Sequence, residues 1–494
     1  MIGTCDYLAL HSRLRPSATA MLELATQRRW TYQSADLTVA RYAASLRRHG
    51  IAEGDRVAVL SKNRADLAFI HLSCARIGAI YVPLNWRLAP AELRKLIEDA
   101  EPRILLGDAM LAQAQLAGTS LDDFASTAEG TEPFLFPPVD PDAISLILYT
   151  SGTSGRPKGV LLSERNIWET ALNFSTLGCV THESAVLCDS PMFHIIGLVT
   201  TVRSVLMRGG RFIVSDGFAP ERTLARLADP ALGVTHYFCV PQMAAAMRAS
   251  PAFEPHKLRR LTGIFSGGAP HSAHAIRSWT SEGIAMADGF GMSEAGTVSC
   301  MPLELDRIDS HAGSVGIVPP GLRVRILDER GQECGPGEAG EVLLRGASVT
   351  SGYWRQPDET RSAFTKDGWL RTGDIARVDG DGFMWILDRK KDMFISGGEN
   401  VYPAEIEGVL SAYPHMAECA VVGVGDERWG EVGHLAVVPL PNHHLDKAHI
   451  AEFLAARLSR YKIPKHISVI EKLPRNGAGK VVKSVLRSML AQQR

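Results

Sequence analysis

The sequence predicts an α/β fold with a large N-terminal domain and a small α+β C-terminal lid domain. The large domain is expected to hold two parallel-type sheet subdomains and a small β-barrel. Three observations predict this. The chain has 494 residues, more than one domain of ~100–200 residues. Short apolar strands alternate with helix-like segments before about residue 313, a pattern typical of parallel sheets covered by helices. Beyond that point, strands follow one another with turns alone between them.

The N-terminal alternation is readable strand by strand. Apolar runs predict strands at 56–60, 79–83 and 103–106, and apolar residues at helical spacing predict a helix between the first two. The segment 108–142 is polar or mixed and is interpreted as a surface connection. Alternation then resumes, with further strands predicted at 186–187, 211–214, 234–240, 261–265 and 284–286.

In the later part of the chain, the pattern changes from alternating strands and helices to consecutive strands. Strands are predicted at 314–317, 322–327, 341–344 and 383–387, and Val378-Asp-Gly-Asp-Gly-Phe383 is a hairpin signal. The charged run 388–392 is interpreted as a boundary, although a solvated surface would have the same composition. Strands at 418–424 and 434–438 and a helix at 447–461, capped by Asp446, predict a compact tail. The predicted divisions are an adenylation domain at 1–387 (sheets about 1–312, barrel about 313–387), a hinge at 388–391 and a lid at 392–494.

Composition indicates which binding partners and which cellular environment to expect. A formal net charge of −1 and a pI near 7.0 favour neither nucleic acid nor an acidic membrane surface. None of the eight cysteines forms a Cys-x-x-Cys pair, so we expect reduced thiols in a cytoplasmic protein, without a disulfide framework or a zinc site. The absence of a signal-like start and of a run of ~20 apolar residues predicts no stable membrane anchor. The oligomeric state stays open, with a homodimer as one option.

The most informative stretch is Tyr149-Thr-Ser-Gly-Thr-Ser-Gly-Arg-Pro-Lys-Gly159, which follows an apolar strand. Glycines let backbone N–H groups turn toward an anion, hydroxyls add donors, and a lysine adds charge. A polyphosphate cradle is therefore predicted, formed by Thr150, Ser151, Gly152, Thr153, Ser154, Gly155 and Lys158. The spacing is not that of a Walker A loop. A flexible Ser/Gly linker is the alternative.

Three further motifs follow in order. Ser266-Gly-Gly-Ala-Pro270 ends a predicted strand, Asp288-Gly-Phe-Gly-Met-Ser-Glu294 is interpreted as a Gly-rich turn after another, and Thr372-Gly-Asp374 places a carboxylate at a turn. Together with the loop at 149–159, these motifs resemble those of the adenylate-forming superfamily of acyl-CoA synthetases, luciferases and peptide-synthetase adenylation domains. The resemblance covers essentially the whole chain. Phe290 and Ser293 stand where the family carries Tyr and Thr, and both keep an aromatic ring and a hydroxyl.

The resemblance implies roles in binding ATP and Mg²⁺. Asp374 would hold the ribose hydroxyls, Arg389 would contact ribose or phosphate, and Glu294 with Thr150 would bind the metal. The remaining nucleotide-binding residues would be Gly267, Gly268, Ala269, Asp288, Gly289, Phe290, Gly291 and Ser293.

The resemblance also implies the catalytic, hinge and coenzyme A residues. Lys480 would stabilise charge at the α-phosphate, and Lys391 would be the pivot of the lid. Ser396, Gly397 and Gly398 would lie along the coenzyme A arm. Trp429 would stack on the adenine of coenzyme A, or alternatively pack the small domain.

An apolar acyl pocket is expected next to the nucleotide. His194 would line and gate it, and its further lining would come from Ile195, Val240, Ala295 and Gly296. The implied reaction is activation of an apolar fatty, aryl or alicyclic acid as an acyl-adenylate with release of pyrophosphate, then transfer to coenzyme A. An amino-acid adenylation domain, which carries an Asp near the position of Phe193-His194, a ligase that loads a separate carrier protein and a non-catalytic ATP-binding protein are the alternatives.

Overall fold

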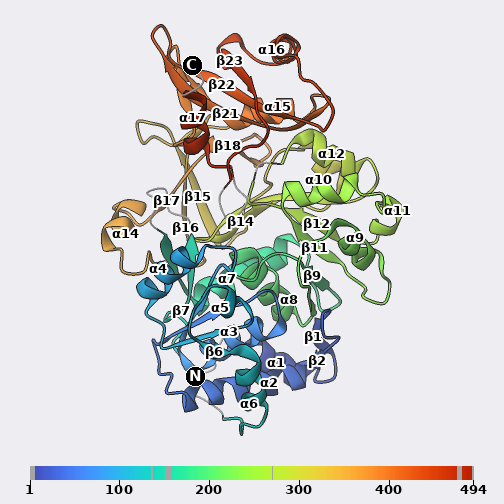
Figure 1. Cartoon of the computed structure of the whole chain (residues 1–494), viewed down its shortest axis with the longest axis vertical. Helices are drawn as coiled ribbons and strands as arrows, with labels where there is room; N and C mark the ends of the chain where they lie inside the picture. Colours follow the sequence, from blue (N-terminus) through green and yellow to red (C-terminus); the bar gives the residue numbers. More distant parts are fainter. Residues whose placement is uncertain (1–5, 135–136, 151–156, 270, 476–480, 492–494) are drawn as a thin grey trace.

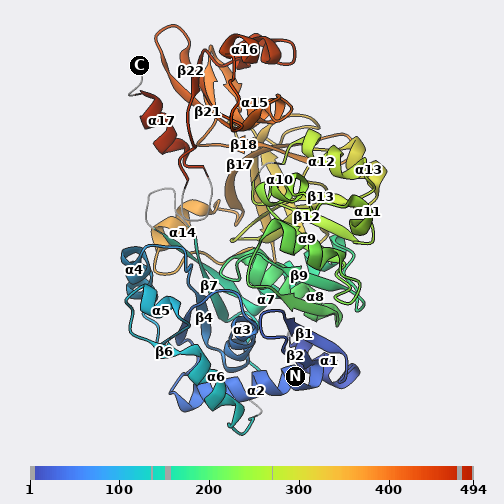
Figure 2. The same cartoon turned by 45° about the vertical axis from the view of Figure 1, so that its right-hand side comes forward.

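The computed structural model describes residues 6–134, 137–150, 157–269, 271–475 and 481–491. Two large sheets form its N-terminal part, a four-stranded sheet follows, and a five-stranded sheet forms the C-terminal part. In Figure 1 the C-terminal elements stand at one end of the long axis, above the elements that hold the predicted nucleotide motifs. Figure 2 shows the same separation after a turn of the molecule.

The eight-stranded sheet has the order β14-β13-β12-β11-β9-β10-β1-β2. Its inner strands pair in parallel, and an antiparallel strand stands at each edge. The strands are β1 Thr19–Glu23, β2 Arg29–Thr31, β9 Ala185–Cys188, β10 Arg211–Val214, β11 His236–Cys239, β12 Gly263–Ser266, β13 Met286–Met292 and β14 Gly296–Cys300.

The six-stranded sheet has the order β6-β5-β3-β4-β7-β8 and is parallel except at β8. The strands are β3 Arg56–Leu60, β4 Ile80–Pro83, β5 Ile104–Gly107, β6 Thr119–Ser120, β7 Ile144–Thr150 and β8 Lys158–Ser163. The helices with these sheets are α1 Tyr7–Leu14, α2 Tyr32–Arg48, α3 Ala65–Ile77, α4 Pro90–Ala100, α5 Met110–Gln113, α6 Leu121–Glu129, α7 Glu164–Leu177, η1 Ile196–Thr200, α8 Val202–Arg208, α9 Pro220–Ala228, α10 Pro241–Ala249, α11 Pro255–Leu258, α12 Ala273–Thr280 and α13 Leu305–Ser310.

The later sheets are mainly antiparallel. The four-stranded sheet holds β15 Leu322–Leu327, β16 Gly340–Gly346, β17 Leu370–Val378 and β18 Met384–Arg389, with α14 Pro357–Ala363 inserted before β17. The C-terminal elements are β19 Phe394–Ser396, β20 Glu399–Val401, α15 Pro403–Leu410, β21 Met416–Asp426, β22 Gly430–Pro439, α16 Lys447–Ala455, η2 Arg460–Lys462, β23 His466–Val469 and α17 Lys483–Ala491.

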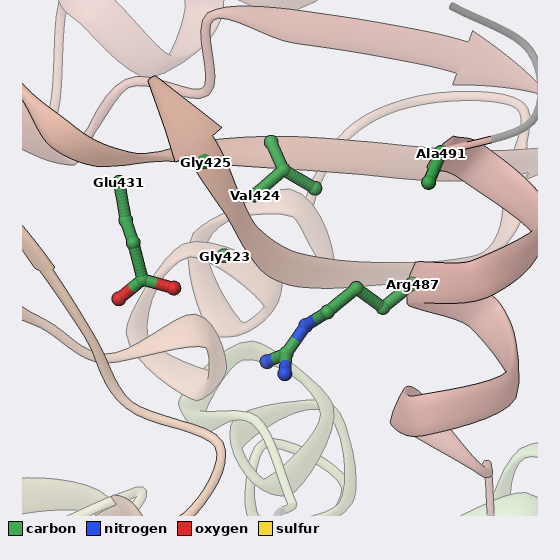
Figure 3. Close-up of a pocket in the computed structure, with 6 residues that line it drawn as sticks. All are labelled: Gly423, Val424, Gly425, Glu431, Arg487 and Ala491. Carbon is green, nitrogen blue, oxygen red and sulfur yellow. The ribbon is translucent and has the colours of Figure 1, made fainter. Parts of the chain in front are cut away.

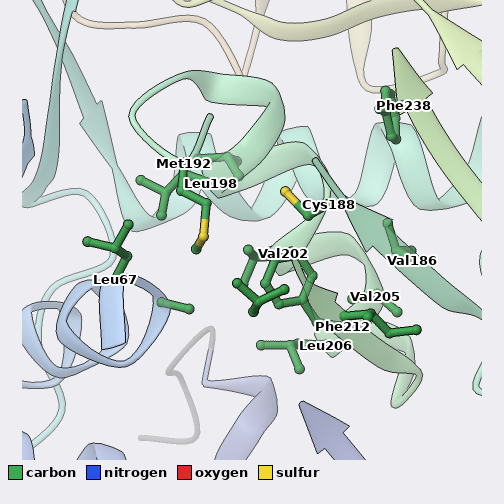
Figure 4. Close-up of a cluster of buried hydrophobic side chains, with 14 of the residues drawn as sticks. Leu67, Val186, Cys188, Met192, Leu198, Val202, Val205, Leu206, Phe212 and Phe238 are labelled. Carbon is green, nitrogen blue, oxygen red and sulfur yellow. The ribbon is translucent and has the colours of Figure 1, made fainter. Parts of the chain in front are cut away.

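One large apolar core is shared by the two N-terminal sheets, a second and smaller one packs α4 and α5 on the six-stranded sheet, and the later sheets have small cores of their own. Figure 4 shows part of the large core, where Val202, Val205 and Leu206 of α8 meet Phe212 of β10. Within the described residues, no helix has both the length and the apolar character needed to cross a membrane.

The predicted α/β class and the change to antiparallel strands are confirmed. The four-stranded sheet is open in its strand order, and the closed barrel stays a prediction.

Some local predictions were wrong. The segment 108–142 is not a plain surface connection, because it forms α5, β6 and α6, and Leu121 and Phe124 of α6 are buried at helical spacing. The C-terminal helix predicted to reach residue 461 ends at Ala455.

Two motifs predicted as turns lie inside strands. The Gly-rich segment from Asp288 to Met292 belongs to β13, which pairs with β14. A Cβ at Gly291 would lie 2.6 Å from the carbonyl oxygen of Gly296, so this glycine serves the close approach of two strands. Asp374 likewise lies within β17, opposite Arg389 of β18.

Candidate active site

The segments at 266–269 and 288–294 meet at one edge of the eight-stranded sheet. Ser266 and Asp288 are paired in the parallel register of β12 and β13, so Gly267 and Gly268 emerge from β12 directly beside Asp288. A Cβ at Gly267 would lie 3.1 Å from the carbonyl oxygen of Gly289, and Gly268 has a φ of +80°. Only glycine gives the backbone this shape without strain.

Asp288 is an unusual carboxylate at this edge. Its side chain is buried, and burial raises its pKa well above the usual range, although a hydrogen bond from the backbone of Gly289 opposes the shift. Its Oδ1 atom has no hydrogen-bond partner among the described residues. A buried polar atom of this kind is satisfied when a ligand donates to it.

Lys158, Glu294 and Tyr353 form a connected group at the start of β8. Thr150 and Lys158 are paired in the register of β7 and β8, and the Lys158 ammonium lies 5.0 Å from the centre of the Tyr353 ring. The Tyr353 hydroxyl donates to Oε1 of Glu294 over 3.1 Å. Lys158 also forms an ion pair with Glu359 of α14. Tyr353 thus contacts a cation and a carboxylate from distant segments, the cation through its ring and the carboxylate through its hydroxyl.

Sequence reasoning missed Tyr353 and Glu359. Tyr353 lies 59 residues from Glu294, and Glu359 lies 201 residues from Lys158. The Gly352-Tyr-Trp354 run after a strand was a weak signal that no motif singled out. Packing places it here, because Trp354 N–H donates to the Gly159 carbonyl over 2.7 Å.

Asp374 and Arg389 form the second polar group. Arg389 Nε lies 2.7 Å from Asp374 Oδ1, and the aspartate is buried while the arginine is exposed. Asp374 N–H donates to the hydroxyl of Thr372 over 3.0 Å, which fixes the backbone at this point. A buried carboxylate beside a surface guanidinium suits a ligand that carries both hydroxyls and phosphate.

His194 lies on a loop that is clamped from the other large sheet. Asn63 donates to the Ser190 carbonyl over 2.8 Å and accepts from Met192 N–H over 2.9 Å. The π-helical segment η1 follows at once and packs on α7, α8 and β14. Such π-helical turns are common at functional sites.

The other predicted acyl-pocket residues come from elements around η1. Ala295 and Gly296 are buried at the start of β14, and a Cβ at Gly296 would lie 2.1 Å from Oγ1 of Thr170 on α7. Val240 follows β11, and Ile195 is partly buried beside His194.

The predicted coenzyme A residues are brought together in the C-terminal part. Gly397 N–H donates to the Trp429 carbonyl over 2.9 Å, and a Cβ at Gly397 would lie 2.9 Å from the Trp429 ring. The ring is 45% exposed, with Arg428 4.9 Å from its centre. The exposed ring offers a stacking face, and the stacking of Trp429 on coenzyme A stays a prediction.

The predicted pivot lies in a turn between β18 and β19. Lys391 is exposed there, and its neighbour Lys390 is held by a bond from its N–H to the Gly373 carbonyl and by its ammonium 2.9 Å from Glu341. Ser151, Gly152, Thr153, Ser154, Gly155 and Lys480 lie outside the described residues.

A cavity of about 280 Å³ lies apart from these groups, among β21, β22 and α17. Figure 3 shows Glu431 and Arg487 on opposite sides of it, with Gly423 and Gly425 of β21 also in its lining. None of its lining residues belongs to the predicted nucleotide or acyl sites.

The described residues fit a magnesium nucleotide. The orphaned Asp288 oxygen supplies an acceptor, the side-chain-free backbone at Gly267–Gly268 supplies space, and the Lys158–Tyr353–Glu294 group supplies charges of both signs. Magnesium is usually held by one or two carboxylates and by phosphate oxygens. Glu294 would hold this ion together with the Thr150 hydroxyl.

Comparison with known proteins gives a consistent picture. The family model "AMP-binding enzyme" matches residues 8–354, and "AMP-binding enzyme C-terminal domain" matches residues 405–480. A feruloyl-CoA synthase from an Amycolatopsis species is 36% identical over 98% of both chains. An indoleacetate–CoA ligase from Aromatoleum aromaticum is 34% identical over 99% of this chain and 98% of its own.

A solved structure agrees with these relatives. The crystal structure of ATP-bound MatB from Rhodopseudomonas palustris is 31% identical and superposes over 99% of both chains with a TM-score of 0.89. The matches cover nearly the whole length of the chain. The chain therefore belongs to the AMP-binding enzyme family and is an AMP-forming acid–thiol ligase.

Proposed function

We propose that the enzyme activates a compact apolar carboxylic acid with ATP·Mg²⁺ and transfers the acyl group to coenzyme A. The observation that carries this proposal is the grouping of Lys158 and Tyr353 with Glu294, at the end of the segment that begins at Asp288 beside Gly267–Gly268. Charges of both signs together with side-chain-free backbone suit a metal-bound polyphosphate.

Each residue has a role in this scheme. The Lys158 ammonium attracts the phosphates, and Glu294 binds the ion that neutralises their charge. Phe290 and the backbone of Gly267, Gly268 and Ala269 border the base. Asp374 accepts from the ribose hydroxyls, and Arg389, its partner at 2.7 Å, contacts ribose or phosphate.

The reaction has two steps. The substrate carboxylate attacks the α-phosphorus, the bond to the β-phosphate oxygen breaks, and pyrophosphate leaves. The thiol of coenzyme A then attacks the acyl carbon and AMP leaves. We assign Lys480 to the charge that develops in the first step. The C-terminal part would turn about Lys391 between the steps, so that Gly397, Gly398 and Trp429 receive coenzyme A.

The acid is proposed to be compact because an aromatic layer closes the space beneath Val240. Alternate residues of β11 face the same side, and Val240 continues the extended backbone. Phe238 therefore lies one layer below Val240, about 7 Å along the strand. Its ring centre lies 4.6 Å from Phe174 of α7 and 5.2 Å from Phe265 of β12.

A filled aromatic layer favours an aryl or alicyclic acid over a long fatty chain. Tyr237 points to the other face, where its hydroxyl donates to Asp189, and so takes no part in this layer. The aryl acids in the names of the two relatives support this choice. The cytoplasmic location and the homodimer stay predictions.

The test is pyrophosphate release with ATP·Mg²⁺ over a panel of arylpropenoic, arylacetic, alicyclic and C6–C16 fatty acids, with and without coenzyme A. We expect aryl acids to react, coenzyme A to speed turnover and give a thioester, and Lys480→Ala to stop adenylation. Turnover without thioester would instead favour a carrier protein as acceptor. ATP binding without reaction of any acid would favour a non-catalytic protein.

Phe238→Ala tests the aromatic layer. We expect this variant to accept longer acids than the wild type. Phe212→Leu, which changes a buried ring of β10 in the main core, is the control and is expected to keep the wild-type preference. Equal use of C16 and aryl acids by the wild-type enzyme would overturn the compact-acid proposal.

A further inference from the structure

Three charged side chains from three elements are grouped around α15. They are Asp388 near the end of β18, Glu407 of α15 and Lys483 at the start of α17. The Lys483 ammonium lies 2.9 Å from Oε1 of Glu407, with side-chain exposures of 16% and 22%. The same Glu407 oxygen accepts from Val421 N–H of β21 over 2.8 Å. The lysine is thus fixed to the C-terminal sheet.

The Asp388 side chain links the segment before the pivot to the segment after it. It precedes Lys391 in the chain, and its Oδ2 atom accepts from Ala404 N–H, in the first turn of α15, over 2.8 Å. Its Oδ1 atom accepts from Arg389 N–H over 2.7 Å. The carboxylate therefore joins the end of β18 to the N-terminus of a helix that follows the pivot.

Electrostatics ties Lys483 to the same carboxylate. Burial alone would lower the pKa of Lys483, but Glu407, Asp388 and Asp392 raise it above its ordinary value. Burial raises the pKa of Asp388, and the charge of Lys483 opposes that shift. Removing either charge leaves the other buried with less compensation.

We propose that Asp388, Lys483 and Glu407 form a latch that holds the C-terminal part in the orientation seen here. The chain superposes over nearly its full length with a solved structure that has ATP bound, so we assign this orientation to the adenylation step. Asp388 and Lys483 are then positioning residues for adenylation, and the hydrogen bond from Ala404 N–H to Asp388 opens when the C-terminal part turns. This inference rests on the proposed two-step function.

The test separates the two half-reactions. Adenylation is followed by ATP–pyrophosphate exchange with the accepted acid, and transfer by thioester formation from preformed acyl-adenylate and coenzyme A. We expect Lys483→Met and Asp388→Asn to slow adenylation about tenfold or more, while transfer is unchanged or faster. Lys483→Arg keeps the charge and is expected to restore much of the adenylation rate.

A matched control is another lysine that pairs with a glutamate of α15. Lys462 lies 2.6 Å from Glu405 of α15, with similar exposures of 18% and 36%, but this pair, unlike the latch, includes no residue that precedes the pivot. Lys462→Met is expected to leave the ratio of the two half-reactions unchanged. An equal loss in both half-reactions with Lys483→Met, or the same ratio change with Lys462→Met, would overturn the latch.

A second readout does not need activity. Small-angle scattering of the ligand-free protein should show a changed distance distribution for Lys483→Met and Asp388→Asn, with the Lys462→Met profile equal to that of the wild type. Unchanged profiles for all three variants, each folded by thermal melting, would count against the latch. If the profiles of the variants change but the wild-type enzyme releases no pyrophosphate with any acid, the latch is supported and the proposed function is refuted.

Discussion

Replacing Tyr353 by Phe tests whether the hydroxyl that contacts Glu294 supports metal-nucleotide binding. The substitution removes one hydrogen bond, from the Tyr353 hydroxyl to Oε1 of Glu294, and keeps the ring beside Lys158. Burial and the nearby Glu294 carboxylate raise the pKa of Tyr353, so the hydroxyl stays a donor at working pH.

The magnitude follows from the geometry. Hydrogen bonds to charged groups contribute about 1.5–3 kcal/mol. The 3.1 Å separation is long for a hydroxyl donor, and the contact is only partly buried, which places it at the low end. About 1.5 kcal/mol corresponds to about a tenfold change. We therefore expect about a tenfold lower kcat/KM for ATP·Mg²⁺ and a higher Mg²⁺ concentration at half-saturation.

The assay is pyrophosphate release at varied ATP·Mg²⁺ and varied free Mg²⁺, with thermal melting to check the fold. Tyr353→Leu also removes the ring beside Lys158 and should lose a further few-fold, since exposed cation–π contacts contribute about 0.5–1 kcal/mol. Tyr42→Phe, whose hydroxyl bonds to Asp66 elsewhere, is the control. Wild-type kinetics in a folded Tyr353→Phe enzyme would refute the reasoning.

Three further predictions follow from single contacts. Gly296→Ala places a Cβ 2.1 Å from Thr170 Oγ1 at a φ of +65°, so we expect a clearly lower melting temperature, and an unchanged one would contradict the close packing of α7 on β14. Burial raises the folded-state pKa of Asp288 above its unfolded value. The loss of folding stability caused by this carboxyl is therefore absent below the unfolded pKa and grows as the pH rises toward the folded pKa. Asp288→Asn should thus gain melting temperature over the wild type as the pH rises from 4 to 8, and a pH-independent difference would contradict this. Asp446→Ala removes the cap on Ala448 N–H and should cost about 1 kcal/mol in denaturant unfolding, with adenylation unchanged.

The sequence by itself determined the class of fold and most of the candidate residues. Periodicity of two and of 3.6 is a local property, so alternating strands and helices were readable in order. The motifs at 149–159, 266–270 and 288–294 allowed nucleotide binding to be predicted, because glycines, hydroxyls and charges lay within a few residues of one another. The prediction of turns and strands failed where a glycine allows close packing of two strands and does not form a turn, as at Gly291.

Only the tertiary structure decided which distant residues complete the site. Tyr353 and Glu359 reach Glu294 and Lys158 because β8 lies beside the segment at 350–354. Phe174, Phe238 and Phe265 form one layer because α7 packs on β11 and β12. Asp388 and Lys483 each contact α15, through Ala404 N–H and Glu407. The physical reason is that local patterns specify elements, whereas contacts between elements depend on how their buried faces fit together.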